Sequence, residues 1–162
     1  MKNNLAFGIS FSFIFFFFLG CGTKPSTKSG TTPNSNLVEF EADILSHINR
    51  HRRSKGLITL ETNQVIVSEA RKHSQQMANG RVSLGHSGFS ARVQRISNQL
   101  GPVNKSAENV AAGSRTAQEV VSNWLSSPGH RQNIEGNFTL TGIGVARNSK
   151  GVIYYTQLFI RK

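Results

Sequence analysis

Three segments of the chain carry side chains that can do chemistry and that a packed core does not require. His86 lies between two glycines in a short polar stretch, Glu108 precedes Asn109, and His130 follows a Pro-Gly pair in WLSSPGHRQNI, residues 124–134. Two imidazoles and a carboxylate can bind Zn²⁺ or another divalent cation and leave one coordination position open. They can equally hydrogen-bond one another and hold the segments together. Either use requires the three segments to converge on one cleft.

Hydrolysis would need a nucleophile or an activated water in addition. Ser87 and Ser127 lie beside the histidines in the sequence, and we interpret both as turn residues. No stretch matches a glycine-flanked serine elbow or a helical metalloprotease pair, so we assign no catalytic residue. His47 and His51, four residues apart, are interpreted as helix-surface residues, and so is His73.

Helical patterns come first in the folded part of the chain. Apolar residues recur at helical spacing from Leu37 to a stop at Gly56, from Asn63 to Asn79, and again from about Ser90. Thr116 and Glu119 form a capping box that begins a fourth helix, which Pro128 ends in a turn. We treat residues 106–111, which hold Glu108, as a connection between helices.

Strand patterns close the chain. Residues 138–146 and 152–160 are rich in β-formers, and the five residues between them favour a hairpin. Helices followed by a closing hairpin predict an α+β domain with helices packed on a small antiparallel sheet.

The N-terminus resembles a bacterial lipoprotein signal. Lys2 precedes an apolar run from Leu5 to Leu19, which is too short for the roughly 20 residues of a membrane-spanning helix. Gly20 and Cys21 follow the run, and Cys21 is the one cysteine in the sequence. We therefore expect a signal peptide at 1–20, and a lipidated Cys21 with a flexible polar tether at 21–36. The folded domain is expected at 37–162.

The charge of the chain limits its partners. There are 19 Lys and Arg against 8 Asp and Glu, and removal of Lys2 with the signal leaves a formal charge of +10. This favours an anionic environment, such as phospholipid head groups, acidic polysaccharide or an acidic protein. Export excludes nucleic acid, and the basic residues do not alternate with exposed aromatic residues as a stacking groove requires.

Six motifs in a fixed order resemble the CAP superfamily, which includes cysteine-rich secretory proteins, insect venom antigens and plant pathogenesis-related proteins. The short bacterial branch is the most similar. The motifs cover residues 38–160 and are Asn49-x-x-Arg52, Gly85-His86-Ser87, Glu108-Asn109-Val110-Ala111, Trp124-x-x-Ser127-Pro128-Gly129-His130-Arg131-x-Asn133-Ile134, Gly142-Ile143-Gly144-Val145-Ala146 and Tyr155-Thr156-Gln157-x-Phe159.

The resemblance implies an α-β-α sandwich with a cleft that typically holds two histidines and two glutamates. His86 and Glu108 match the first of each. Ser127 stands where the second glutamate is expected, and Tyr154 where the second histidine is expected. His130 belongs to the Ser-Pro-Gly-His-Arg motif and is a candidate to replace a lost group. With half the tetrad missing, we favour a structural network over a metal site.

Three functions remain open. The first, which we favour, is a non-enzymatic binding module, anchored by an N-terminal lipid such as palmitate and displayed at the outer membrane and cell surface. Its ligand would be a sterol-like lipid, an anionic polysaccharide, or a host or envelope protein. The second is a metal-assisted, protease-like hydrolase that uses His86, Glu108 and His130. The third is a structural envelope protein with a vestigial site.

Overall fold

The computed structural model describes residues 33–162, so the signal peptide, Cys21 and most of the tether lie outside the described residues. No helix in this part combines the length and apolar character needed to cross a membrane. The helices are α1 (Pro33–Ser54), α2 (Gln64–Ala78), α3 (Phe89–Leu100), α4 (Ala117–Ser126) and α5 (Pro128–Ile134). The strands are β1 (Glu61–Thr62), β2 (Lys105–Ala112), β3 (Leu140–Arg147) and β4 (Ile153–Arg161).

The strands form one sheet in the order β1-β3-β4-β2. β3 and β4 make the expected hairpin, and β2 pairs antiparallel with β4 so that Glu108 lies opposite Leu158. The two-residue β1 pairs parallel with β3. Glu108 and Asn109 therefore lie on an edge strand, next to the helices that flank it.

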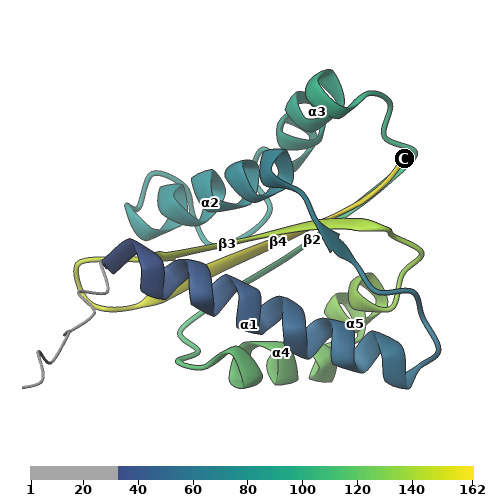
Figure 1. The fold of residues 1–162 in the computed structure, drawn as a ribbon. Coiled ribbons are helices and arrows are strands. Elements are labelled where there is room, and N and C mark those ends of the chain that lie inside the picture. The colour runs from purple at the N-terminus through teal and green to yellow at the C-terminus, as the bar shows by residue number, and fades with distance from the viewer. Residues whose placement is uncertain (1–32) are drawn as a thin grey trace, which may run out of the picture. The chain divides into compact units, whose positions relative to one another are not determined.

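Helices cover both faces of the sheet, as Figure 1 shows: α2 and α3 lie on one face, and α1, α4 and α5 on the other. This is the α-β-α sandwich expected from the sequence. The larger apolar core lies on the α1 side and is built from buried side chains such as Ile44, Ile48, Val120, Trp124, Tyr155 and Phe159. Burial of each such side chain contributes about 1.5–3 kcal/mol to folding.

The opposite layer is held by a close backbone approach. A Cβ atom on Gly144 would lie 2.1 Å from the backbone nitrogen of Arg71, and one on Gly142 would lie 2.3 Å from that of Val67. α2 thus rests directly on β3, and Ser74 donates a hydrogen bond to the Gly144 carbonyl at 2.8 Å. This contact sets the distance between α2 and the sheet, and so the position of His73, which lies on α2.

The four helices and the two long strands expected from the sequence are confirmed, and three details differ. α1 begins at Pro33, four residues before Leu37, because proline is tolerated in a first turn where its missing N–H has no partner. Residues 106–111 are not a connection but lie in strand β2, where pairing with β4 overrides weak strand propensity. Pro128 ends α4 but also begins α5, since its ring suits a first helical position.

Candidate functional site

Strand alternation sends the side chains of Glu108 and Asn109 to opposite faces of the sheet. Glu108 lies on the face covered by α2 and α3, and Asn109 on the face that carries α5. Both are buried, with 5% and 0% of their surface exposed. Because β2 is an edge strand, groups from both faces can meet around its outer side.

The Glu108 carboxylate is saturated with hydrogen bonds. Arg92 on α3 donates through Nε to Oε2 at 2.9 Å, and through its second guanidinium nitrogen to Oε1 at 2.9 Å and Oε2 at 2.7 Å. His86 Nδ1 lies 2.9 Å from Oε1 and supplies the fourth contact. A carboxylate offers about four lone-pair positions, so this one has none free.

Arg92 and His73 together hold the loop that carries His86. The remaining Arg92 nitrogen donates to the Ser87 carbonyl at 2.7 Å and contacts His73 Nδ1 at 3.1 Å. His73 Nε2 in turn donates to the Gly85 carbonyl at 2.7 Å. Burial, and secondarily the Arg92 charge, lower the pKa of His73, which the Gly85 hydrogen bond partly opposes. A neutral His73 with its hydrogen on Nε2 fits both contacts.

A second polar network attaches α5 to the other side of β2. Asn133 Nδ2 donates to Asn109 Oδ1 at 2.9 Å and to the Glu108 carbonyl at 3.2 Å. Asn109 Nδ2 donates to the His130 carbonyl at 3.1 Å. The histidine after the Pro-Gly pair is thus placed through its backbone, which leaves the ring available.

The two histidines differ in exposure. The His86 side chain is 55% exposed, although Nδ1 contacts buried Glu108. His130 is half-buried, and its pKa is lowered first by burial and then by the charge of His86. Within residues 33–162 no hydrogen bond joins the two rings, which come from opposite layers of the sandwich.

Ser127 and Tyr154 lie apart from this contact. Within the described residues neither side chain hydrogen-bonds His86, Glu108 or His130. Ser127 joins α4 to α5 and makes no capping bond with its side chain. Tyr154 shares the Glu108 face of the sheet but stands four residues along β4 from Leu158, roughly 13 Å away.

The candidate metal ligands His86, Glu108 and His130 are not placed to bind a divalent cation together. Each Glu108 oxygen already accepts from Arg92, whose positive charge lies where a cation would have to approach. Among residues 33–162 no group of three or more His, Cys, Asp and Glu side chains is arranged to hold a metal ion. The arrangement is instead a hydrogen-bonded network between charged and polar groups.

Three residues of this network were missed from the sequence. Arg92 stands among Phe89, Val93 and Ile96 on the apolar side of its helix, and an arginine at such a position is a usable signal of a buried partner. His73 was assigned to the helix surface, which is wrong because it is fully buried. For Asn133, only its place in the 124–134 motif indicated a role in the site.

Asn49 and Arg52 on α1 hydrogen-bond to the backbone of other segments. Asn49 makes two hydrogen bonds with Leu60, and buried Arg52 donates to four carbonyls, those of Ile58, Ile134, Gly136 and Phe138. His51 contacts Glu135 at 2.8 Å, so it joins α1 to the end of α5 and is not half of a metal pair with His47.

Comparison with known proteins gives the following matches. The family model described as the cysteine-rich secretory protein family (CAP) matches residues 45–159. A protein of Bacillus subtilis described as "Uncharacterized protein YkwD" is 31% identical over 142 residues, which are 86% of this chain and 54% of that protein. The chain thus spans about half the length of this curated relative.

Solved structures share the fold. An extracellular protein containing an SCP domain from Bacillus anthracis is 28% identical with a TM-score of 0.65, over 81% of this chain and 44% of that chain. An outer surface protein from Borrelia burgdorferi is 22% identical with a TM-score of 0.68, over 76% of this chain and 93% of that chain.

Proposed function

Since the chain belongs to the cysteine-rich secretory protein (CAP) family, we propose that it is a non-enzymatic binding domain of the bacterial cell envelope. A lipid on Cys21 anchors it, and the surface around His86 and His130 recognises an acidic polysaccharide.

The saturated carboxylate of Glu108 carries this proposal. A general base must have a free lone pair within reach of the proton that it takes, and a metal ligand needs one for the cation. Glu108 has neither, because Arg92 and His86 supply four hydrogen bonds to its two oxygens. Arg92 therefore argues against the metal-assisted hydrolase and in favour of a site that binds.

The groups left for a ligand are imidazoles. His86 uses Nδ1 for Glu108 and has Nε2 free for a ligand, while the lowered pKa of His130 favours a neutral ring at pH 7, with one donor and one acceptor. Such groups suit hydroxyl-rich molecules. The excess of basic residues favours an acidic sugar polymer over a neutral one.

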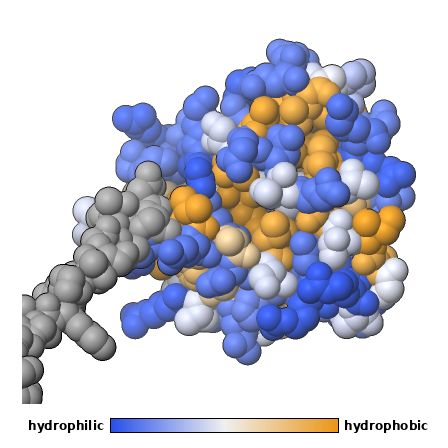
Figure 2. Space-filling view, in the orientation of Figure 1, coloured by the Kyte–Doolittle hydropathy of each residue, from blue (hydrophilic) through white to orange (hydrophobic). Residues whose placement is uncertain are grey.

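The surface gives less support for a sterol-like ligand than for an acidic polysaccharide. The large apolar side chains that are exposed, Val38, Ile58, Leu84 and Val152, come from four separate segments of the described chain. Figure 2 shows apolar side chains interrupted by hydrophilic ones on the face that carries α1. Scattered apolar residues of this kind are ordinary on a soluble surface.

Anchoring and display rest on the N-terminal pattern. The apolar run that precedes Cys21 supports lipidation, and the absence of an acidic residue in 22–24 favours the outer membrane. The 28% identical relative from Bacillus anthracis is described as extracellular, which supports export. Palmitate labelling of cells should mark the wild-type protein and leave a C21A variant unlabelled and released from membranes.

Binding is tested by titration calorimetry with uronic-acid oligosaccharides of defined length, with neutral dextran oligomers as the control ligand. The double variant H86A/H130A should lower the affinity at least about tenfold, as expected for the loss of one or two ligand hydrogen bonds. The H47A variant, which changes a histidine on α1, should bind as the wild type does.

Two results would contradict the proposal. Equal affinity of wild type and H86A/H130A would mean that this surface is not the binding site. New reducing ends in the oligosaccharide, or cleavage of a casein substrate, that H86A abolishes would instead support the hydrolase.

A further inference from the structure

A basic hollow lies at the turn end of the sheet. It has a volume of about 450 Å³ and is formed by residues 113–115, before α4, and by the β3–β4 turn. Arg115, Arg147 and Lys150 line it, and no acidic residue does. Its size lies in the range of hollows that hold a small molecule or a head group.

The loops that present these cations are fixed by hydrogen bonds. Asn148 Oδ1 accepts from the backbone of Lys150 at 3.0 Å and from that of Val152 at 2.9 Å, which shapes the turn. Buried Tyr155 donates its hydroxyl hydrogen to the Ser114 carbonyl at 2.6 Å, which secures the other loop. An anion that binds here would therefore meet loops whose backbone is already ordered, and little backbone entropy would be lost.

The three cations that line the hollow form no ion pair. All eight acidic residues of the sequence lie within the described part, and none of them makes an ion pair with Arg115, Arg147 or Lys150. The Glu119 carboxylate contacts one of these loops through the backbone, since it accepts from the Arg115 N–H at 2.8 Å. By contrast, the smaller hollow between α1 and α2 holds Glu41 paired with Arg71.

The same end of the domain is where α1 starts. The Phe40 ring packs against Tyr155 at 5.8 Å between centroids, whereas Arg52, near the end of α1, reaches the Phe138 carbonyl at the far end of the sheet. Figure 1 shows the start of α1 beside the β3–β4 turn. Eleven residues lie between Cys21 and Pro33, and the tether expected from the sequence would span on the order of 20 Å.

We propose that Arg115, Arg147 and Lys150 form a docking site for the phosphate groups of anionic phospholipids in the membrane that holds the Cys21 lipid. This inference rests on the anchored location given under the proposed function. The lipid on Cys21 supplies the anchor, and a basic patch on the domain adds attraction to anionic head groups. The site holds the turn end of the domain against the head groups and directs the other end away from the membrane.

The test uses the chain without residues 1–20 and with C21A, so that no lipid contributes. Co-sedimentation is measured with vesicles of phosphatidylcholine alone and with 30% phosphatidylglycerol, in 0.1 M salt. We expect binding only to the anionic vesicles, with the partition coefficient lowered about fivefold for each cation removed and about a hundredfold for R115Q/R147Q/K150Q.

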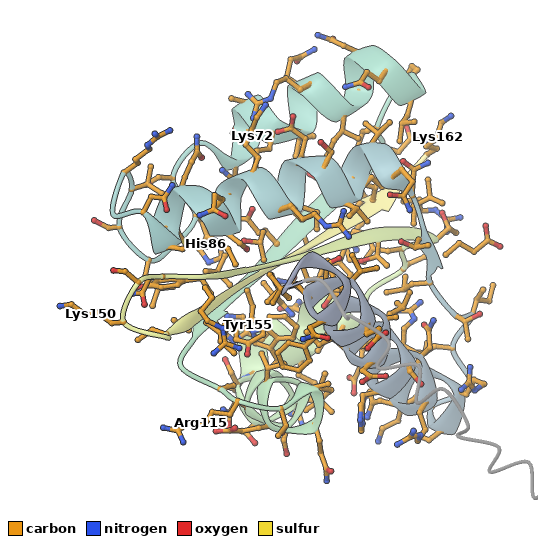
Figure 3. All side chains as sticks on the ribbon, turned by 60° about the vertical axis from the view of Figure 1, so that its left-hand side comes forward. Lys72, His86, Arg115, Lys150, Tyr155 and Lys162 are labelled. Atoms are coloured by element: carbon orange, nitrogen blue, oxygen red, sulfur yellow. The ribbon has the colours of Figure 1, made fainter. Side chains whose placement is uncertain are left out.

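A matched triple variant, K105Q/R161Q/K162Q, removes the same charge from the opposite end of the sheet, where Lys105 pairs with Arg161. Figure 3 shows Arg115 and Lys150 on one side of the domain and Lys162 on the other. This control should bind anionic vesicles within about twofold of the unsubstituted C21A chain, because its cations face away from the surface. Circular dichroism should show both triple variants folded.

Equal losses in the two triple variants would overturn the proposal, since net charge alone would then explain binding. Equal binding to neutral and anionic vesicles, or to neither, would overturn it as well. Palmitate labelling of Cys21 and oligosaccharide binding around His86 and His130 are separate readouts, so the docking site can fail while the proposed function stands. If the wild-type protein is not labelled with palmitate but the C21A chain still binds anionic vesicles, the proposed anchoring fails while the docking site stands.

Discussion

Arg92 and Arg95 stand three residues apart on α3, and each binds a buried glutamate of another element. Arg92 binds Glu108 with both side chains almost completely buried, at 4% and 2% exposure. Arg95 binds Glu69, but its own side chain is 44% exposed. The two arginine–glutamate pairs therefore differ in energy. If Arg95 is removed, water can hydrogen-bond the glutamate in its place, but water cannot reach the buried position of Arg92.

The comparison separates a pair that organises a site from one that supports a surface. Arg92 also holds the Ser87 carbonyl and contacts His73, so its loss would release the loop that carries His86. Arg95 donates only to Glu69 Oε2, and Lys72 lies 3.7 Å from the other oxygen as a second cation.

The largest loss of stability is expected for the R92M variant. This variant leaves a buried Glu108 without its cation, which should lower the free energy of unfolding by about 3–5 kcal/mol. Urea denaturation at pH 7 measures the loss. The double variant R92M/E108M removes both charges and should recover most of it. A loss of less than about 1 kcal/mol in R92M would mean that the pair is not as buried as described.

A smaller change in the free energy of unfolding is expected when the pH is lowered. Burial lowers the pKa of His73 below its ordinary value of 6.5, so the unfolded chain binds a proton there that the folded chain does not. Stability should therefore fall as the pH drops below 6.5, until the pH reaches the lowered pKa of the folded state. Urea denaturation at pH 7.5, 6.5 and 5.5 should show this slope. H73Q should flatten it, and an unchanged slope in H73Q would exclude His73 as its source.

The smallest effect is expected for R95M, at about 0–1 kcal/mol, because an exposed cation contributes little. Arg95 lowers the pKa of Glu69, first through its hydrogen bonds, so the pair stabilises the fold above the ordinary value of 4.5. This contribution disappears as the pH falls through the lowered pKa. Thermal unfolding of wild type and R95M should therefore differ at pH 7 and converge in acid. A loss in R95M as large as that in R92M would invalidate the comparison.

Periodicity and capping located the helices well, because those signals are local. Asn63 and Thr116 cap α2 and α4 with their side chains, as their positions in the sequence indicate. β2 could not be found in this way, since Lys105, Glu108 and Asn109 are poor strand formers and only pairing with β4 extends them.

The candidate site could be predicted from the sequence only in part. The types of His86 and Glu108 marked them as candidates, and the structure brings them into contact. No local pattern joins Arg92 to Glu108, which lies 16 residues away on another element. Which lone pairs are free, and hence whether the site can hold a metal, depends on that contact.

By itself the sequence determined the α+β class, the order of helices and strands, and the residues able to do chemistry, because these follow from local pattern and residue type. The tertiary structure alone decided that Glu108 faces α3 while Asn109 faces α5, and that Arg92 uses the carboxylate. Strand register and helix packing set those contacts, and both arise from interactions between residues distant in the chain.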